Sequence, residues 1–510
     1  MTLAAADLPE VVAWLRAQAP AAQLSSDSRI VASGDVFFAY PGDAADGRTF
    51  IVQAIEKGAC AVIHEAADFS WRDEWCIPHL AVTGLKRQAG LIASDYYDHP
   101  DSAMFTVGVT GTNGKTSCTQ WLGYALSRLH GPTAVIGTLG VGVFDRGSDS
   151  GFSATGYTTP DAVWLQRQLA ELRNANVAAL AIEASSIGLE QHRLHGMHFD
   201  AALFTNFTRD HLDYHGDMAH YEAAKTMLFD WSGLRHAIVN LDDPMGLRLV
   251  SRMRERTPGV NIIGYSLQGV EVDGVGTLQA TAMRSNAAGT VFQLASPFGS
   301  AQVKTQLVGQ FNVSNVLGIV GALLAKGIAW RTAIDAVEVL TAVPGRMQQF
   351  GGQEAPLVVI DYAHTPDALE KTLVALRQVV QERGGELWCV FGCGGDRDPG
   401  KRPQMGAVST AADHVIVTSD NPRSEDPQAI IEKIIDGMKT TNNLKHAPQA
   451  IADRAAAILS AIKHAARQDV VLLAGKGHET YQEIKGKKYP FKDADHAALA
   501  LATRVMKGAA

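Results

Sequence analysis

The chain lacks several features that would place it in a special class of proteins. Its 510 residues include only five cysteines, and these are scattered, odd in number and form no C-x-x-C pair. We therefore expect reduced thiols in a cytoplasmic protein. The most apolar stretch, Val316 to Ala325, ends at Lys326 and is shorter than the roughly 20 residues that cross a bilayer. The first residues also lack the basic segment of a secretory signal, so we expect no membrane insertion.

The chain also lacks a large excess of either positive or negative charge. The 45 Lys and Arg residues against 53 Asp and Glu give a net charge of −8. No long basic run is present, so nucleic acid is not an expected partner. A hydrophobic content of 46% with 19% charged residues excludes a disordered or coiled-coil chain. A chain of this length suggests about three domains.

The order of apolar runs and turn signals predicts an α/β protein of three domains. Residues 1–102 are expected to form a mixed α/β domain with a short strand at Val36–Tyr40. Residues 103–343 alternate strands with helices and are expected to form a P-loop-like, mostly parallel α/β domain, which closes with a helix near Trp330–Leu340. Residues 344–510 are expected to form a Rossmann-like α/β domain. We expect the whole chain to be a monomer.

Four polar loops follow four apolar runs in the last of these segments. The runs are residues 357–360, 387–391, 414–418 and 470–473, and the loops are residues 361–364, 392–397, 420–423 and 475–479. Ligands of open α/β sheets bind beyond the carboxyl ends of the strands. The four loops are therefore predicted to meet at one crevice.

A glycine-rich loop connects a predicted strand at Phe105–Val109 to a predicted helix. Its residues read Thr110-Gly-Thr-Asn-Gly-Lys-Thr-Ser117. Glycines allow backbone N–H groups to turn toward an anion, and Lys115 can reach the outer phosphates of a nucleotide. Val109 stands where the strict phosphate-loop pattern has glycine, so this is a shortened variant. The alternative is a tight turn with a solvated lysine.

This loop resembles the signature of the Mur ligases, the ATP-dependent amide ligases of peptidoglycan synthesis. Further runs resemble the same family in the same order: residues 183–186, 191–193, 205–215, 221–225, 311–315, 344–346, 361–366 and 420–423. The resemblance implies that ATP converts a carboxylate to an acyl phosphate, which an amine then attacks. The implied substrates are UDP-N-acetylmuramoyl-L-alanyl-D-glutamate and meso-2,6-diaminopimelate. The alternatives are an L-lysine-adding ligase, a ligase of the folylpolyglutamate synthetase superfamily, or an ATP-binding switch without ligase chemistry.

The resemblance also implies roles for residues of the central and last segments. Lys115, Glu183, His211 and Lys225 are implied as catalytic, with Thr116, Glu183 and His211 on Mg²⁺ and with Lys225 carbamylated by CO₂. The implied ATP-binding residues are Gly111, Thr112, Asn113, Gly114, Lys115, Thr116, Ser117, Asn312, Asn315, Arg346, Asp361 (toward the ribose) and His364.

Some of these residues also have a simpler structural or metal-binding interpretation. His211 and His215 have the spacing of two zinc ligands on a helix, although the H-E-x-x-H pattern is not met. Asn312 or Asn315 could cap a helix. Lys225 on a helical stretch is most often a solvated lysine.

The remaining implied contacts concern the other two substrates. The UDP-muramoyl-dipeptide, with its nucleotide end on residues 1–102, is implied to contact Ser28, Arg48, Thr158, Thr159, Ser185, Gln191 and Arg193. The amino acid is implied to bind the last segment through Arg397, Asp420, Asn421, Pro422, Arg423, Gly475 and Glu479.

The chemistry of the amino acid explains the composition of that second set. Meso-diaminopimelate has an ammonium and a carboxylate beyond those that join the peptide, and lysine lacks that carboxylate. A guanidinium fork suits a carboxylate, which favours Arg423, while Asp420 or Glu479 suits the ammonium. The alternative for Arg423 is an ion pair with Glu425 or Asp426 in a surface loop.

Overall fold

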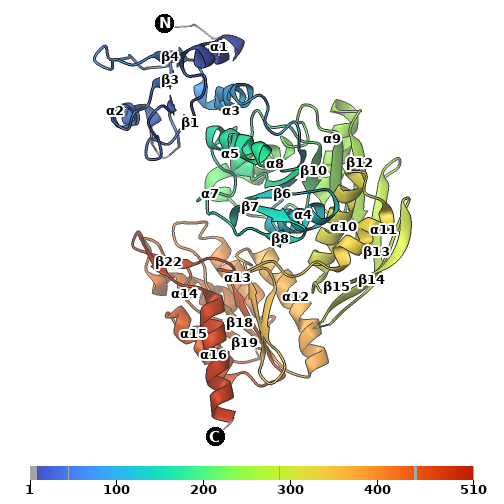
Figure 1. Ribbon diagram of the computed structural model, residues 1–510. Coiled ribbons are helices and arrows are strands. Elements are labelled where there is room, and N and C mark those ends of the chain that lie inside the picture. The colour runs from blue at the N-terminus through green and yellow to red at the C-terminus, as the bar shows by residue number, and fades with distance from the viewer. Residues whose placement is uncertain (1–7, 44, 287, 442–444, 509–510) are drawn as a thin grey trace.

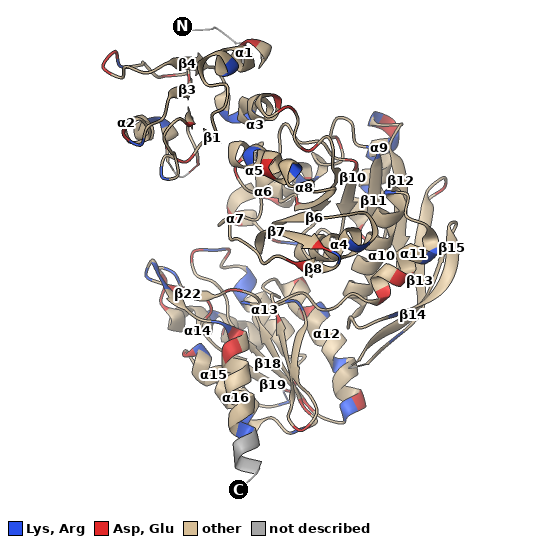
Figure 2. Cartoon of the chain, in the orientation of Figure 1, with Lys and Arg blue, Asp and Glu red and all other residues tan. Residues whose placement is uncertain are grey.

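The computed structural model of the chain describes residues 8–43, 45–286, 288–441 and 445–508. Three large sheets follow one another from the N-terminal part at the top of Figure 1 to the C-terminal part at the bottom, and a fourth, two-stranded sheet belongs to the C-terminal part. Within the described ranges, no helix combines the length and the apolar character that crossing a bilayer requires. Lys and Arg are interspersed with Asp and Glu over all three parts (Figure 2).

The N-terminal part is a parallel sheet of four strands in the order β1-β2-β3-β4. Its apolar residues form a buried core with α1 and α3. Asp161 fastens this part to the next one, since its carboxylate accepts hydrogen bonds from Ser26 Oγ and Tyr40 Oη, both at 2.6 Å. The elements are β1 (Leu24–Ser25), β2 (Val36–Ala39), β3 (Ala61–Glu65), β4 (His79–Val82), α1 (Leu8–Gln18), η1 (Gly47–Phe50), α2 (Ile51–Glu56) and α3 (Leu85–Tyr96).

The central part is built on an eleven-stranded sheet in the order β15-β14-β13-β12-β11-β10-β5-β9-β6-β7-β8. The strands from β13 to β6 run parallel, and antiparallel strands extend both edges. The strands are β5 (Phe105–Thr110), β6 (Thr133–Gly137), β7 (Gly140–Asp145), β8 (Ser148–Asp149), β9 (Ala179–Glu183), β10 (Ala201–Phe204), β11 (His236–Asn240), β12 (Asn261–Ser266), β13 (Gly276–Asn286), β14 (Gly289–Ser296) and β15 (Gly299–Thr305).

Helices bury both faces of this sheet, which is why its inner strands are apolar on both sides. One core contains residues of α4, α10 and α11, and the other contains residues of α5 and α9. The apolar stretch Val316–Ala325 lies in α10, inside the first core. The helices are α4 (Lys115–Leu129), α5 (Ala162–Asn174), α6 (Ser186–Glu190), α7 (Leu212–His215), α8 (Met218–Thr226), α9 (Pro244–Arg256), α10 (Gln310–Ala325) and α11 (Trp330–Glu338).

The C-terminal part is a six-stranded sheet in the order β16-β17-β21-β18-β19-β20, parallel except for β16. Helices cover both faces of it. The elements are β16 (Gln348–Gly351), β17 (Leu357–Asp361), β18 (Leu387–Phe391), β19 (His414–Val417), β20 (Gln449–Ala450), β21 (Val470–Ala474), α12 (Pro366–Arg383), α13 (Lys401–Ser409), α14 (Pro427–Met438), α15 (Arg454–His464) and α16 (Asp493–Gly508), with a hairpin of β22 (Tyr481–Ile484) and β23 (Lys487–Pro490).

Local sequence explains where the helices beside the site begin and end. The side chain of Thr365 caps α12, Pro366 occupies its first turn, and Gly384 ends it in the left-handed conformation, an order typical of helix boundaries. The predicted α/β class with parallel-rich sheets is confirmed. The strands predicted near residues 36, 105, 357, 387, 414 and 470 are β2, β5, β17, β18, β19 and β21, and the predicted helix near Trp330 is α11.

Candidate functional site

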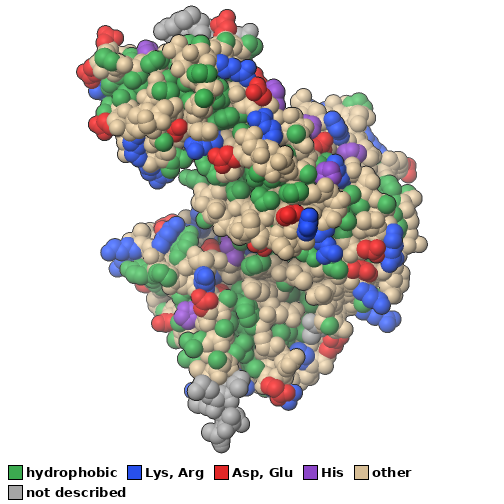
Figure 3. All heavy atoms as spheres, viewed as in Figure 1, with side chains coloured by type: hydrophobic (Ala, Val, Ile, Leu, Met, Phe, Trp, Pro, Cys, Tyr) green, Lys and Arg blue, Asp and Glu red, His purple; other side chains and the backbone are tan. Residues whose placement is uncertain are grey.

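A cavity of about 820 Å³ lies between the central and C-terminal sheets. Figure 3 shows the surface hollowed at the left of the view, between the N-terminal part above and the C-terminal part below. The glycine-rich loop, the end of β9 and the start of α10 line it from the central part. Residues around Arg346, Tyr362 and Lys371 line it from the C-terminal part. Among its lining residues are Thr112, Asn113, Gly114, Lys115, Thr116, Ser117, Thr158, Thr159, Glu183, Ser185, Arg193, His211, Lys225, Asn312, Asn315, Arg346, Asp361, His364 and Arg397.

The conformation of the glycine-rich loop requires glycine at two positions, because a side chain would not fit at either one. Gly111 has φ +145°, and a Cβ there would lie 1.9 Å from Thr205 Oγ1. Gly114 has φ +89°, and a Cβ there would lie 2.8 Å from Asn315 Oδ1. The N–H groups of Thr112 and Asn113 donate to Asn206. Since the first N–H groups of a helix have no partner within it, the start of α4 is the part of the loop suited to an anion.

Two lysines reach the same carbonyl group of this loop. Lys115 Nζ lies 2.7 Å and Lys225 Nζ lies 2.8 Å from Gly111 O. Lys225 is buried, with its ammonium 4.4 Å from the centre of the Tyr221 ring. Burial lowers the pKa of Lys115, and burial followed by the charge of Lys115 lowers the pKa of Lys225 well below its ordinary value. The reading of Lys225 as a solvated lysine is therefore wrong.

Glu183 ends β9 with its side chain buried in the cavity wall. Its Oε1 accepts the N–H of Thr138 at 2.8 Å, and its Oε2 lies 3.1 Å from Thr138 Oγ1. Gly137 leaves room for this carboxylate, because a Cβ there would lie 2.3 Å from Glu183 Oε1. A buried carboxylate with few donors beside it is stabilised by a cation, and Lys115 supplies positive charge nearby.

His211 faces the cavity beside an acid that the sequence analysis did not single out, Asp210. The Asp210 carboxylate lies 3.5 Å from His211 Nε2 and 3.6 Å from His364 Nε2. Burial acts to raise the pKa of Asp210, but the hydrogen bond and charge of His364 outweigh it and hold that pKa well below its usual range. Burial lowers the pKa of His211 to about 4, despite Asp210. His211 is therefore a neutral imidazole at pH 7.

The C-terminal part contributes a guanidinium and a carboxylate to the cavity. Arg346 donates to Thr116 Oγ1 at 3.0 Å and stacks on the Tyr362 ring at 4.3 Å. Asp361 accepts the N–H groups of Met347 at 2.8 Å and Ala363 at 2.9 Å. Its pKa is raised by burial. Asp361 thus holds in place the segment that carries Arg346.

Asn312 and Asn315 lie on the first turns of α10. Gly309 occupies the N-cap position of this helix, so the capping role considered for the asparagines is wrong. Asn312 Nδ2 donates to Val308 O at 2.9 Å. Asn315 faces Gly114 of the glycine-rich loop, which places it at the junction of loop and helix.

A chain of hydroxyl groups extends from Glu183 toward the N-terminal part. Thr159 Oγ1 contacts Glu183 O at 2.8 Å and Ser185 Oγ at 2.7 Å. Thr158 Oγ1 lies 3.1 Å from Thr138 Oγ1. Arg193 donates to Thr159 O at 2.8 Å and to Gln191 Oε1, and Gln191 also hydrogen bonds to Asp43 of the N-terminal part.

Ser28 and Arg48 do not line this cavity. Ser28 Oγ donates to Gln53 Oε1 at 2.7 Å, and Arg48 forms a fork on Asp46. Both lie on the N-terminal part. Of the residues expected at ATP and at the dipeptide, all line the cavity except Gly111, Gln191, Ser28 and Arg48. Gly111 and Gln191 hydrogen bond to lining residues, Lys115 and Arg193, whereas Ser28 and Arg48 lie apart.

The loops that follow β18, β19 and β21 contact one another. Arg423 Nη1 donates to Gly395 O at 2.7 Å, and its Nε lies 3.6 Å from Glu483 Oε2. Glu425 is bound by Arg402 instead. Arg423 pairs with Glu483 and not with Glu425 or Asp426, so that alternative is wrong. Arg397, which is more than half exposed, lies 3.4 Å from Asp213 and also lines the cavity.

A fully buried lysine lies at the centre of these loops, and the sequence analysis assigned it no role. Lys476 Nζ lies 2.8 Å from Glu479 Oε2, 3.2 Å from Asn421 Oδ1 and 3.5 Å from Asp420 Oδ1. Asn421 Nδ2 also donates to Glu479 at 2.8 Å. The two acids expected at a substrate ammonium thus already face the ammonium of Lys476. Its place in the Gly475–Glu479 loop was the only signal in the sequence.

His211 and His215 do not form a pair of zinc ligands. The side chain of His215 is fully buried, 2.9 Å from Glu190 Oε2 and 2.9 Å from Ser186 Oγ. His211 lies beside Asp210 in the cavity wall. Because the two rings have different partners, the helical spacing does not make a shared site.

The environment of His211 predicts its titration. We expect its NMR Hε1 signal, assigned by its loss in His211→Asn, to titrate near pH 4 and not near the ordinary value of about 6.5. Because the pKa of His211 is lower in the folded chain than in the unfolded chain, protonation favours unfolding. The free energy of unfolding is therefore highest above about pH 6.5, as far as His211 contributes to it, and it falls as the pH decreases toward 4. A titration midpoint near pH 6.5 would contradict the prediction that burial lowers the pKa of the His211 ring.

Three family models match the chain in succession. The Mur ligase family catalytic domain matches residues 21–97, the Mur ligase middle domain matches 109–323, and the Mur ligase glutamate ligase domain matches 345–477.

Among solved structures, one of a UDP-N-acetylmuramoyl-L-alanyl-D-glutamate–2,6-diaminopimelate ligase has a TM-score of 0.66 and 35% identity and covers 95% of both chains. A MurF ligase from Thermotoga maritima in complex with ADP, at 18% identity and TM-score 0.64, covers 95% of this chain and 98% of its own and shares the fold.

Two curated relatives match over nearly their whole length. Both are named UDP-N-acetylmuramoyl-L-alanyl-D-glutamate–2,6-diaminopimelate ligase. The one from Janthinobacterium sp. (strain Marseille) is 68% identical over 502 residues, 98% of each chain. The one from Ralstonia nicotianae is 52% identical over 510 residues, 98% of this chain and 97% of the relative. The chain belongs to the Mur ligase family.

Proposed function

We propose that the chain is an ATP-dependent ligase that adds meso-2,6-diaminopimelate to UDP-N-acetylmuramoyl-L-alanyl-D-glutamate in peptidoglycan synthesis. One observation carries the proposal: the glycine-rich loop with Lys115, the buried Glu183 and Arg346 of the C-terminal part line one cavity. The relatives of that name, which match over nearly the whole chain, support the choice of substrates.

The first chemical step we propose is phosphorylation of the D-glutamate carboxylate. A carboxylate oxygen attacks the γ-phosphorus of ATP, the bond to the β-γ bridging oxygen breaks, and ADP leaves. Negative charge accumulates on phosphate oxygens, so donors placed beforehand should contribute most of the rate. Lys115, the first N–H groups of α4 and Arg346, whose guanidinium lies 3.0 Å from Thr116 Oγ1, supply those donors.

In the second step the amino group of the amino acid attacks the acyl carbon. The bond from that carbon to the phosphate oxygen breaks, and the phosphate leaves with the proton that the amine releases. Acyl phosphates react with water. The position of the cavity between two parts of the chain allows their closure to exclude water while the amine binds.

Thr116, Glu183 and His211 are the residues that would hold Mg²⁺. They fit a cation because Glu183 is a buried carboxylate with one polar neighbour, Thr138, on its oxygens and because His211 is uncharged at pH 7. Bound Mg²⁺ would neutralise charge on the transferring phosphoryl group. We also propose that Lys225 is carbamylated. Its lowered pKa supports an uncharged amine that can react with CO₂.

Selection of the amino acid is assigned to the loops around Arg423. The guanidinium is half-buried and held by one backbone carbonyl, with Glu483 at 3.6 Å, so part of its fork remains for a substrate carboxylate. Lysine would leave this charge without its partner, and an unmet charge in such a site is costly. Asp420, Asn421, Pro422, Gly475, Glu479 and Arg397 would complete the contacts to the amino acid.

The arrangement of the substrates follows from the same assignments. We propose that residues 1–102 hold the UDP end through Ser28 and Arg48, that residues 103–343 hold ATP, and that residues 344–510 hold the amino acid. Thr158, Thr159, Ser185, Gln191 and Arg193 would hold the dipeptide between the first two. The five cysteines of the chain are free, which supports the proposed cytoplasmic location. The monomeric state stays a prediction.

The activity can be tested by phosphate release from ATP in the presence of the UDP-muramoyl-dipeptide. We expect rapid release with meso-diaminopimelate and little release with L-lysine or with no amino acid, because only the first brings a carboxylate to Arg423. Equal rates with lysine would contradict the selectivity. Nucleotide binding with no release under any of these conditions would indicate an ATP-binding switch.

Replacing Arg423 by alanine separates amino-acid binding from nucleotide binding. Truncating one member of a buried charge pair costs about 2–5 kcal/mol, so we expect the KM for diaminopimelate to rise about thirtyfold or more. The KM for ATP should stay within about twofold. Arg467→Ala, which removes an exposed arginine of the same part, is the control. A similar rise in both KM values would place Arg423 at the nucleotide or in the packing of its loop.

A further inference from the structure

A second group of metal-ligating side chains lies away from the cavity described above. Glu386 directly precedes β18, His414 begins β19, and His446 lies shortly before β20. One ligand atom from each of the three lies within 4.8 Å of the others. These positions are at the amino ends of the strands, whereas the proposed substrate loops follow the carboxyl ends. A strand of four or five residues separates the two edges by roughly 15 Å.

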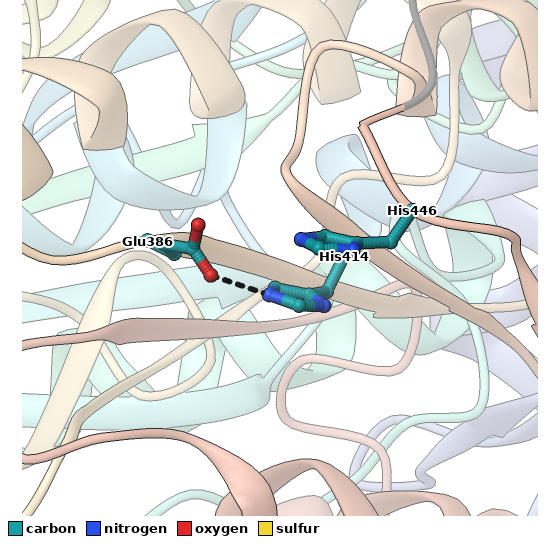
Figure 4. A group of neighbouring side chains, drawn as sticks. All are labelled: Glu386, His414 and His446. Carbon is teal, nitrogen blue, oxygen red and sulfur yellow. Dashed lines mark hydrogen bonds and ion pairs between the residues drawn. The ribbon is translucent and has the colours of Figure 1, made fainter.

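The three side chains face a common point. Glu386 Oε2 lies 2.7 Å from His414 Nε2. The rings of His414 and His446 are stacked, with centres 4.2 Å apart and an interplanar angle of 6°. Figure 4 shows a ring nitrogen of each histidine directed toward the side on which the Glu386 carboxylate lies. Two imidazoles and one carboxylate are a common ligand set for zinc.

The site is partly held in place by its surroundings. The ring of His414 stacks on Trp388 at 3.9 Å, and Trp388 Nε1 donates to Asp469 Oδ2 at 3.1 Å. A cavity of about 300 Å³ adjoins the two histidines, which leaves room for a water ligand. One protein group competes for the carboxylate: Lys445 Nζ contacts Glu386 Oε1. Its side chain is about half exposed, so it can move into solvent.

We propose that Glu386, His414 and His446 bind one divalent transition-metal ion, with Zn²⁺ the best match to their chemistry. A tetrahedral ion with bonds of about 2.0–2.2 Å needs the ligand atoms to approach one another more closely than 4.8 Å. His446 is exposed and precedes the two-residue strand β20, so its side chain can make this adjustment. The ion would link the chain before β20 to the start of β19. It is separate from the Mg²⁺ ascribed to the ligase cavity.

The test is Zn²⁺ binding to the full chain by isothermal titration calorimetry, with excess Mg²⁺ present to occupy sites for hard cations. We expect wild type to bind one Zn²⁺ more than either His446→Gln or Glu386→Gln. If residual binding is measurable in those variants, it should be weaker by about tenfold or more, since even the outer partners of metal ligands contribute that much. His464→Gln, which alters an exposed histidine beside the same cavity, should match wild type.

Two further readouts separate a metal site from a simple ion pair. Lys445→Ala should tighten Zn²⁺ binding by about two- to fivefold, the equivalent of one exposed ion pair. Zn²⁺ should raise the thermal unfolding midpoint of wild type and have a smaller effect on His446→Gln. Identical stoichiometry and affinity in wild type, His446→Gln and Glu386→Gln would overturn the proposal. Glu386 would then serve only as the ion-pair partner of His414 and Lys445.

Discussion

The convergence of two lysines, the partly buried Lys115 and the buried Lys225, on the Gly111 carbonyl is the interaction on which the cavity depends. Lys115 and Lys225 both contact this one oxygen, and burial lowers the pKa of each. Since both amines lie within 2.8 Å of one oxygen, the positive charge of Lys115 would repel a protonated Lys225 in a medium of low dielectric constant. A triphosphate beside Lys115 and a carbamate on Lys225 would both relieve that repulsion. The same feature thus favours the binding of an anion and the modification of a lysine.

The rest of the fold supports this arrangement by holding the loop rigidly. β5 lies inside the sheet between β10 and β9, and the loop after it leaves no space for side chains at Gly111 or Gly114. Residues from distant parts of the chain then close around it: Asn206 binds the loop amides, Asn315 packs on Gly114, and Arg346 reaches Thr116. Catalysis by positioned charges requires this kind of support, since a donor contributes only where it is already aimed.

Much of this could be predicted from the sequence, because the relevant signals are local. A buried strand, a glycine-rich loop and a helix are contiguous in the chain, and so are the apolar runs and polar loops of the C-terminal part. The antiparallel strands β14 and β15 were not predicted, although β14 alternates between buried and exposed residues. These strands extend one edge of a mostly parallel sheet, and their short alternating pattern is weak beside the apolar runs of the buried parallel strands.

The burial of charged residues was the main feature that the sequence could not provide. Lys225 and Lys476 have the local sequence of solvated lysines, and only the tertiary structure encloses them. Asp210 stands in a segment that resembles the family, yet its importance depends on His364, more than 150 residues away along the chain. The separation of Ser28 and Arg48 from the cavity likewise depends on how the N-terminal part is placed, which no local pattern encodes.

The central claim is that one nucleotide is bound by residues of both the central and the C-terminal parts. Calorimetric titration of ADP with Mg²⁺ into wild type, Lys115→Ala, Arg346→Ala and the control Arg331→Ala, which alters an exposed arginine of α11, tests it most directly. Hydrogen bonds to charged groups contribute about 1.5–3 kcal/mol, so the account predicts that both site variants raise the Kd by about tenfold or more while the control does not. An unchanged Kd in Arg346→Ala would contradict it, because the nucleotide would then be bound by the central part alone.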